Sequence, residues 1–261
     1  MMQDKKALQA ATSHYFGTRF AEPFEIRFQD RDGVLKYVHQ TTWGLSTRVI
    51  GALIMTHSDD QGLVLPPNAA PLKVVIVPIL QKGKDNSTVL EVGQKIKQEI
   101  ERMQPCYFDD RDEHSAGYKF HEWEVQGIPI RLEIGPRDVA ASSVQLVRRD
   151  GKKKSVKIDQ LSTEISKELA DFQVTLLEKA RKFMAVNTFS EDSYDHFKAR
   201  LEAEGGFFQM HWCGSQACET KIKEETKATI RSIPFDQIKE DGKCVLCANR
   251  SSGRVIFARS Y

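Results

Sequence analysis

The chain has 261 residues, of which 40% are apolar and 28% are charged, and its formal net charge is +2. This composition is typical of a soluble globular protein with room for one large domain or two to three small ones. A net charge this small does not by itself indicate a nucleic-acid partner. No apolar stretch approaches the roughly 18 residues that a membrane-spanning helix needs. The opening residues MMQDKK lack the apolar core of a secretory signal, so we expect a cytoplasmic protein.

The first block, residues 1–67, contains short segments of different character. Residues 5–14 are expected to form a short helix or turn. Residues 24–28 (FEIRF) alternate apolar and polar side chains, which predicts a strand with one buried face. A turn-rich stretch follows, and residues 35–38 could pair back as a hairpin partner.

The stretch 39–57 (HQTTWGLSTRVIGALIMTH) is the most informative part of this block. It predicts a polar loop, a sharp turn at Trp43-Gly44, and an apolar run over residues 49–55. The charged, planar guanidinium of Arg48 could bind a phosphate or a carboxylate through two hydrogen bonds. Small hydroxyl residues supply donors beside it: Thr41, Thr42, Ser46 and Thr47. The residues alone fit equally an ordinary helix start capped by Ser or Thr and packed by its apolar face.

A proline-rich linker at 63–71 precedes a second block with an α/β rhythm, and we place a domain boundary near residue 68. The apolar run 72–80 predicts a strand buried on both faces. A helix follows, capped by Ser87 or Thr88 and ended by Pro105. Another helix is expected at 118–125, and further strands at 106–108, 128–134, 142–148 and 151–157. This alternation predicts a mixed or parallel sheet covered by helices.

A long amphipathic helix, residues 160–186, whose apolar residues recur every three or four positions, is expected to bridge the second block and a third block that begins near residue 187. A membrane-surface role is possible, but a core or interdomain face is favoured. Residues 195–204 predict a short helix, and residues 207–212 and 255–258 predict strands. The basic residues at 148–149 and 152–154 are interpreted as part of a solvated loop.

Five cysteines include two close pairs, Cys213-x4-Cys218 and Cys244-x2-Cys247, separated by the 25 residues 219–243. Two such pairs can bring four thiolates into the tetrahedron that structural zinc prefers. Four protein ligands would leave no open position, so the metal would be structural. The alternatives are a redox pair at Cys244 and Cys247, or unligated buried thiols. Cys106, in a strand-like run, is expected to be a plain core thiol.

Four segments together resemble one family. TTWGLSTRVIGALIMTHSDDQGLVLPP resembles motif 3 of the class II aminoacyl-tRNA synthetases, and more narrowly of the archaeal and eukaryotic type of prolyl-tRNA synthetase. ALQAATSHYFG upstream, DDRDEHSAGYKFHEWEVQGIPIRLEIGPRD downstream and the closing FARSY resemble the same family in the same order. The resemblance covers essentially all 261 residues. The family's motifs 1 and 2, expected before residue 1, are absent from this sequence.

The resemblance implies a multidomain chain of α/β and α+β parts. Residues 1–67 would be the end of an antiparallel class II catalytic domain, with motif 3 as a strand followed by a helix. Residues 68–160 would be an anticodon-binding domain with a mixed sheet, and residues 161–186 a bridging helix. Residues 187–261 would be a small α+β domain, and the resemblance strengthens the expectation of structural zinc on its four cysteines.

The implied function is that of a proline–tRNA ligase, which uses ATP with magnesium to form prolyl-adenylate and transfers proline to tRNA(Pro). This chain would supply motif 3 and anticodon recognition, within an enzyme expected to be a homodimer with no membrane contact. We expect the chain alone to be inactive. Motif 2 should bring the arginine that grips the α-phosphate, and motif 1 most of the dimer interface.

The resemblance also assigns site residues. Arg48 corresponds to the motif 3 arginine on the ATP phosphates, the one catalytic assignment. Residues expected around ATP and proline are Gln9, Thr12, His14, Trp43, Gly44, Ser46, Thr47 and the C-terminal Tyr261. Without the family, His14 would be interpreted as an ordinary loop histidine. Candidates for reading anticodon bases are Arg111, Lys119, Glu133, Arg137 and Arg148.

Two other functions compete with this one. A non-catalytic tRNA- or protein-binding module could have kept the anticodon-binding fold and the zinc domain. A zinc-stabilised redox protein using Cys244 and Cys247 is more remote, because four cysteines in one ligand-like set argue against it. The intact motif 3 favours descent from a working enzyme.

Overall fold

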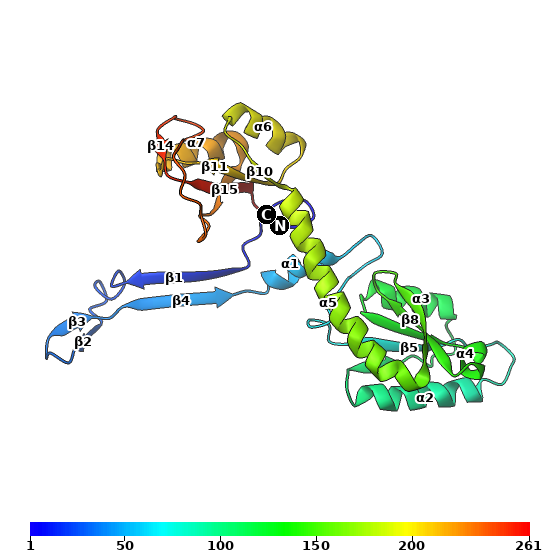
Figure 1. Ribbon diagram of the computed structural model, residues 1–261. Helices are drawn as coiled ribbons and strands as arrows, with labels where there is room; N and C mark the ends of the chain where they lie inside the picture. The colour runs from blue at the N-terminus through cyan, green and yellow to red at the C-terminus, as the bar shows by residue number, and fades with distance from the viewer. The chain divides into compact units, whose positions relative to one another are not determined.

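The computed structural model describes residues 1–261 and divides into two compact units (Figure 1). The first unit combines the two ends of the chain, Met1–Ala52 and Ser190–Tyr261, and the second is the middle of the chain, Leu53–Phe189. None of the helices combines the length and the apolar character that crossing a membrane requires.

The second unit is built on a five-stranded mixed sheet. Its strands are β5 (Val74–Pro78), β6 (Cys106–Phe108), β7 (Ile130–Ile134), β8 (Ser143–Arg148) and β9 (Lys153–Lys157). The spatial order is β6-β5-β7-β8-β9. β5 runs parallel to β6 and to β7, whereas β8 pairs antiparallel with β7 and β9 antiparallel with β8. The mixed sheet expected from the sequence is confirmed.

Helices cover both faces of this sheet. They are α2 (Ser87–Glu101), α3 (Ala116–Val125), α4 (Pro136–Ala140) and α5 (Leu161–Val186), the last preceded by a 3-10 turn at Ile158–Gln160. On one face, Val74 and Ile76 share a core with α2 and the first half of α5. On the other face, Val75 and Val77 pack with aromatic residues of α3. Strand β5 can serve both cores because successive side chains point to opposite faces and all of these are apolar.

The long helix α5 faces the core along its first half. Its buried apolar residues lie three or four positions apart: Leu161, Ile165, Leu169, Phe172 and Leu176. This stripe confirms the predicted amphipathic pattern. Beyond residue 176 the helix exposes apolar and basic side chains, including Leu177, Lys179 and Lys182.

The N-terminal part of the first unit is a two-stranded ribbon. β1 (Ala11–Gly17) pairs antiparallel with β4 (Gln40–Leu45), and β2 (Arg27–Gln29) with β3 (Leu35–Tyr37) forms a small hairpin between them. The predicted helix over 5–14 and the predicted turn at Trp43-Gly44 are therefore wrong. Residues 11–14 belong to β1 and Trp43-Gly44 to β4, and these two strands pair with each other. Helix α1 (Arg48–His57) follows β4, which confirms the strand-then-helix order that motif 3 implies.

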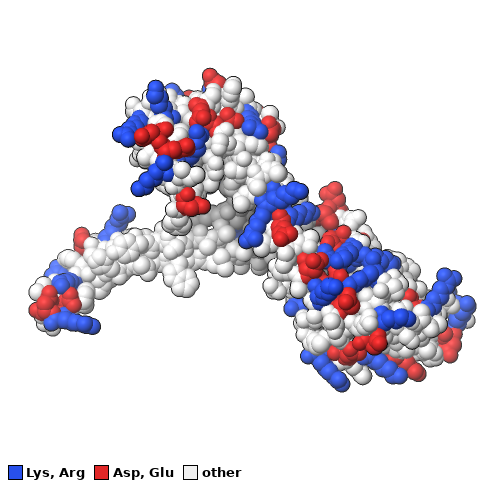
Figure 2. All heavy atoms as spheres, in the orientation of Figure 1, with Lys and Arg blue, Asp and Glu red and all other residues white.

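The ribbon carries apolar side chains on its surface. Figure 2 shows few charged side chains along it between its tip and its base. Tyr15, Trp43 and Leu45 are exposed, and so are Phe24, Ile26 and Phe28. The predicted buried face of residues 24–28 is thus wrong for this chain, since two antiparallel pairs alone cannot cover each other's side chains.

The C-terminal part of the first unit is a small α+β domain. Its four-stranded sheet has the order β10-β11-β15-β12, formed by β10 (Thr188–Ser190), β11 (Phe207–His211), β12 (Ala228–Ser232) and β15 (Arg254–Arg259). Helices α6 (Tyr194–Ala203) and α7 (Gln216–Thr226) and a short pair, β13 (Gly242–Lys243) with β14 (Arg250–Ser251), complete it. Phe197, Phe208 and Phe257 are fully buried and contact one another in its core.

Candidate functional sites

A hollow of about 410 Å³ lies where β1, β4 and the start of α1 meet. Five of the residues predicted to contact the substrates line it: Gln9, Thr12, Gly44, Ser46 and Arg48. The pairing explains this, because Thr12 lies directly opposite Gly44 in the ribbon. Ala10, Ala11 and Leu45 also line the hollow. Nothing in the sequence singles these residues out, since small apolar residues carry no chemical signal of their own.

Arg48 is the first residue of α1. Its side chain is exposed and makes no ion pair or hydrogen bond within the chain. The main-chain carbonyl of Ser46 accepts a hydrogen bond from Val49, and that of Thr47 accepts one from Ile50, so the helix start is tied back to the loop before it. An unpaired guanidinium beside a hydroxyl-rich helix start is suited to bind a phosphate or a carboxylate.

The remaining predicted substrate residues lie near the hollow without lining it. Trp43 pairs with Ser13 and therefore points to the face of the ribbon opposite Gly44. Trp43 is 81% exposed and lines a neighbouring hollow of about 500 Å³ together with Thr12 and Gly44. His14 is exposed and stacks on Phe16 at 5.5 Å between ring centroids.

The C-terminus of the chain pairs with the segment that leads into the hollow. The Ala7 amide donates a hydrogen bond to the Arg259 carbonyl (2.9 Å), and the Tyr261 amide donates one to the Ala7 carbonyl (3.0 Å). Tyr261 is therefore held two residues before Gln9 in the first unit. Its side chain is exposed.

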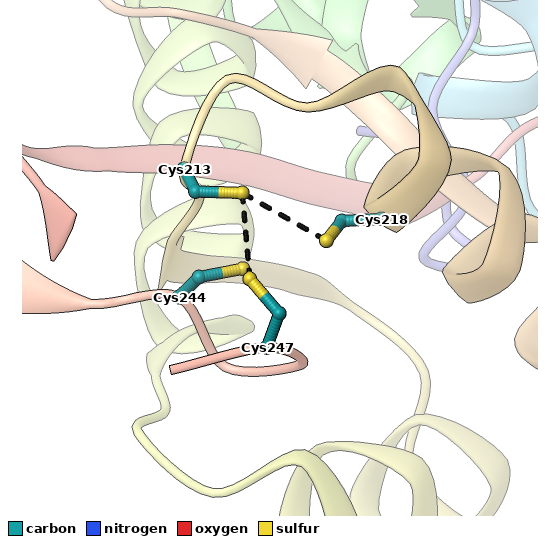
Figure 3. Close-up of side chains that lie close together, drawn as sticks. All are labelled: Cys213, Cys218, Cys244 and Cys247. Atoms are coloured by element: carbon teal, nitrogen blue, oxygen red, sulfur yellow. Dashed lines mark hydrogen bonds between the residues drawn. The ribbon is translucent and has the colours of Figure 1, made fainter. Parts of the chain in front are cut away.

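The four paired cysteines converge on one point (Figure 3). Cys213 follows β11, Cys218 lies in the first turn of α7, and Cys244 and Cys247 lie between β13 and β14. All four sulfur atoms lie within 4.8 Å of one another. The sulfur of Cys213 is 3.7 Å from that of Cys218 and 3.6 Å from that of Cys247. The fifth cysteine, Cys106, is a separate free thiol in β6.

This geometry fits a tetrahedral metal. Four ligands at a zinc–sulfur distance of about 2.3 Å place the sulfur atoms about 3.8 Å apart, close to the distances observed here. Burial raises the pKa of the Cys213 and Cys218 thiols, whereas at Cys244 the main-chain amides of Cys247 and Leu246 outweigh burial and lower the pKa to about 7. The cluster is therefore a fitting site for a structural metal ion, with no position left for a substrate.

The protein around the cluster holds the β13–β14 loop in place. The Val245 amide donates to the carbonyl of His211 (3.1 Å), and Ser251 lies 3.2 Å from Nδ1 of the same histidine. His211 is buried against Gly242, where a side chain at Gly242 would come within 2.2 Å of the ring. The glycine is thus required for this close approach.

Two of the five predicted anticodon residues organise the loop after β6. Arg111 donates two hydrogen bonds to the carboxylate of Asp109 and one to Glu122. Lys119 is 1% exposed, and its ammonium donates to the Asp109 carbonyl at 3.0 Å. Burial opposes ionisation of Asp109, but hydrogen bonds from Arg111 and Trp123 outweigh it and hold the pKa of Asp109 at about 2.

Two more predicted anticodon residues are engaged in ion pairs on the sheet. Glu133 accepts hydrogen bonds from Arg131 and from Lys153. Arg148 is buried and donates to Glu168, and also to Asp150 and Asp171. Its guanidinium lies over the ring of Phe172, 4.9 Å from the ring centroid. These side chains have little hydrogen-bonding capacity left for an RNA base.

Arg137 differs from the other four. It is exposed in the first turn of α4, directly after the carboxyl end of β7, and makes no side-chain hydrogen bond or ion pair. At the neighbouring carboxyl ends of β5 and β6 lies a crevice of about 560 Å³, lined among others by Lys82, His114 and Lys119. The sequence did carry a signal for this crevice, because ligands of α/β sheets bind outside the carboxyl ends of parallel strands.

Family models of known proteins match two of the domains described above. Residues 73–168 match the family model of the anticodon-binding domain, and residues 194–261 match that of the prolyl-tRNA synthetase C-terminal domain. A proline–tRNA ligase from Natranaerobius thermophilus is 47% identical over 264 residues, covering 100% of this chain and 54% of that protein. One from Christiangramia forsetii is 45% identical over 263 residues, with the same coverage.

Solved structures agree. A crystal structure of prolyl-tRNA synthetase from Cryptosporidium parvum, complexed with halofuginone and AMPPNP, superimposes with a TM-score of 0.93 at 36% identity. The superposition covers 98% of this chain and 54% of the Cryptosporidium parvum chain. The chain thus spans about half the length of the relatives it matches.

An anticodon-binding domain followed by a small domain with four converging cysteines places this chain among the aminoacyl-tRNA synthetases. Within that class it is homologous over its whole length to the C-terminal half of proline–tRNA ligases, and it carries the anticodon-binding and C-terminal domains of prolyl-tRNA synthetase.

Proposed function

We propose that this chain is the C-terminal part of a proline–tRNA ligase, acting in the ATP-dependent formation of prolyl-adenylate and the transfer of proline to tRNA(Pro). One observation carries the proposal. The hollow at the base of the ribbon collects five residues that motif 3 and the upstream segment predict to lie at the substrates. The same chain continues into an anticodon-binding domain.

In this proposal the hollow receives ATP with its magnesium. The unpaired fork of Arg48 neutralises phosphate charge by bidentate hydrogen bonds, which a lysine would reproduce poorly. Hydroxyl groups of Thr12 and Ser46 are placed to bind polar atoms of the nucleotide. Trp43 lines the adjoining hollow together with Thr12 and Gly44, and it offers an apolar wall suited to the ring of proline. Rate enhancement comes from positioning and from electrostatic stabilisation, with no covalent intermediate on the protein.

The same proposal assigns anticodon reading to the carboxyl edge of the sheet in the second unit. Arg137 is the free cation among the predicted residues, so it is the candidate for bidentate hydrogen bonds to a guanine. Arg111, Lys119, Glu133 and Arg148 act indirectly, because their ion pairs fix the loops and strands around that edge. This support comes from burial and pairing within the chain.

We further propose that the metal of the four-cysteine cluster is zinc. Thiolate ligands in a tetrahedron are the donor set that structural zinc favours. The ion would join segments that are otherwise short and distant in sequence, so it would contribute to the folding free energy of the small domain.

The test is a competition binding assay at fixed salt, since phosphate contacts alone give salt-dependent, non-specific affinity. The competitors are the anticodon stem-loop of tRNA(Pro) and the same stem-loop with its anticodon guanines replaced. The protein variants are Arg137→Ala and Arg102→Ala. Arg102 is a matched control, because it is also an exposed, unpaired arginine but lies at the C-terminal end of α2.

We expect the unaltered chain to prefer the intact anticodon. Loss of one bidentate base contact costs about 1–3 kcal/mol, so Arg137→Ala should lower the preference by roughly 5- to 150-fold. Arg102→Ala should leave the preference unchanged. Equal binding of both stem-loops by the unaltered chain would contradict the proposed reading function, and unchanged preference in Arg137→Ala would contradict the role of that residue.

A further inference from the structure

A short segment after α1 is bound tightly to the end of α3. We call this segment, residues 58–65, the strap. The Leu63 amide donates to the Val125 carbonyl at 2.9 Å, and the Leu65 amide donates to the Gly127 carbonyl at 3.4 Å. The Ser58 amide donates to the Ile54 carbonyl, so the strap continues directly from the last turn of α1.

Two glycines allow this close approach. Gly62 has φ +131°, and a side chain there would come within 2.6 Å of the Val125 main chain. Gly127 has φ +74°, and a side chain there would come within 2.7 Å of Leu63. Both positions therefore require glycine for conformation and for space. Such a fit indicates a built contact, although the proline-rich sequence that follows predicts only a linker.

Arg149 connects the strap to the end of α3. Arg149 donates through Nη1 and Nη2 to the two carboxylate oxygens of Asp59, at 3.0 and 2.6 Å, and through Nε to the Glu124 carbonyl at 2.9 Å. Its side chain is 2% exposed, whereas that of Asp59 is 47% exposed. The guanidinium thus holds the beginning of the strap and the end of α3 at the same time. A lysine cannot make these three bonds in one plane.

The strap also matters for the helix before it. α1 begins at Arg48 and ends at His57, two residues before Asp59. The first compact unit includes Ala52 and the second begins at Leu53, so this one continuous helix passes from one unit into the other.

We propose that Arg149 is a positioning residue: by tying Asp59 to the end of α3, it fixes the C-terminal end of α1 and couples that end to RNA bound on the anticodon-binding domain. The coupling rests on the proposed function, whereas the fixing of the helix does not. α3 provides the link, because its last turn supplies the carbonyls that hold the strap and its first residues line the crevice at the carboxyl edge of the sheet.

The test is amide hydrogen exchange on the full chain, with and without the tRNA(Pro) anticodon stem-loop. The variants are Arg149→Lys and Asp59→Asn. Arg254→Lys is the matched control, because it is also an arginine that holds carboxylates and a main-chain carbonyl but lies in the first unit and makes no contact with the strap. The central strand β5 serves as internal reference for global unfolding.

Without RNA, we expect both test variants to speed exchange at the Leu63 and Leu65 amides and at residues 53–58 by tenfold or more relative to β5, and the control to leave this ratio unchanged. With RNA, the unaltered chain should gain protection in the strap and at residues 53–58. Arg149→Lys should bind the stem-loop and gain no protection there. That second readout separates positioning from a merely structural role.

Unchanged exchange of these amides in both test variants would overturn the proposal, and so would equal RNA-induced protection in the unaltered chain and in Arg149→Lys. Failure of the unaltered chain to bind the stem-loop would refute the coupling together with the proposed function. The RNA-free comparison would still decide whether Arg149 fixes the helix.

Discussion

Replacing Arg148 by alanine should unfold the second unit more easily and should not act on RNA selectivity directly. Arg148 is 3% exposed and forms ion pairs with Glu168, which is 4% exposed, and with Asp150 and Asp171. Burial opposes ionisation of Glu168, but hydrogen bonds from lysines and from Arg148 hold its pKa at about 2. The carboxylate of Glu168 is therefore charged at neutral pH and needs its partners.

The expected magnitude follows from what the alanine leaves behind. Removing one partner of a buried ion pair costs about 3–5 kcal/mol, because the other charge stays buried without compensation. Lys152 and Lys154 still contact Glu168, which places the expected loss at the lower end, about 3 kcal/mol. The lost packing on Phe172 adds to it.

The measurement is urea-induced unfolding followed by the hydrogen exchange of the β5 amides, compared with the unaltered chain and with Arg137→Ala. Arg137→Ala should stay within about 0.5 kcal/mol of the unaltered stability, because its side chain is exposed and unpaired. The reasoning would be refuted if Arg148→Ala kept its stability and lost the preference for the intact anticodon. That result would make Arg148 a base-reading residue.

Two further predictions concern the metal and acid. Cys244→Ser should lower the bound zinc and the melting temperature of the small domain, and unchanged stoichiometry with unchanged melting would rule out a structural metal there. The pKa of Asp109 is about 2 in the folded chain, below its ordinary value of 3.8. It therefore contributes about 2 kcal/mol above pH 4, which is lost as the pH falls toward 2. Asp109→Asn should remove this part of the acid dependence, and identical pH profiles would contradict it.

Local patterns in the sequence predict those elements of the fold that need only apolar surroundings and no particular partner residue. The run at β5 needs only apolar surroundings on both faces, and its residues 74–77 are fully buried. The buried apolar stripe of α5 likewise needs apolar neighbours, but not particular ones. The cysteine cluster was predictable for a different reason, because its ligands must be thiolates and the spacing of the two pairs is short.

Local patterns could not predict which distant segments pair as strands. Thr12 pairs with Gly44, and 31 residues separate them in sequence. Gly44 has the local signature of a turn, yet it lies inside a strand because β1 supplies a partner. The hollow could therefore be assigned only through resemblance to a family, which placed residues from both strands at one site.

The identity of ion-pair partners was out of reach for a similar reason. Arg149 and Asp59 are 90 residues apart, and nothing near either residue indicates the other. Charged residues in this sequence were interpreted as solvated or as RNA contacts, whereas the second unit uses many of them internally. The error has a physical basis: a charge can be buried only with its partner, and the partner is determined by tertiary structure.

This internal use of charge bears on how the domain could select an RNA. Figure 2 shows basic and acidic side chains intermixed over the second unit, and many of its lysines and arginines pair with carboxylates. Phosphate neutralisation by exposed, unpaired cations near its carboxyl edge, such as Lys82 and Lys84, carries no sequence information. Selectivity would then depend on a small number of directed contacts such as that of Arg137. The buried ion pairs would keep the side chains that make those contacts in place, which is the same role that Arg149 has for the C-terminal end of α1.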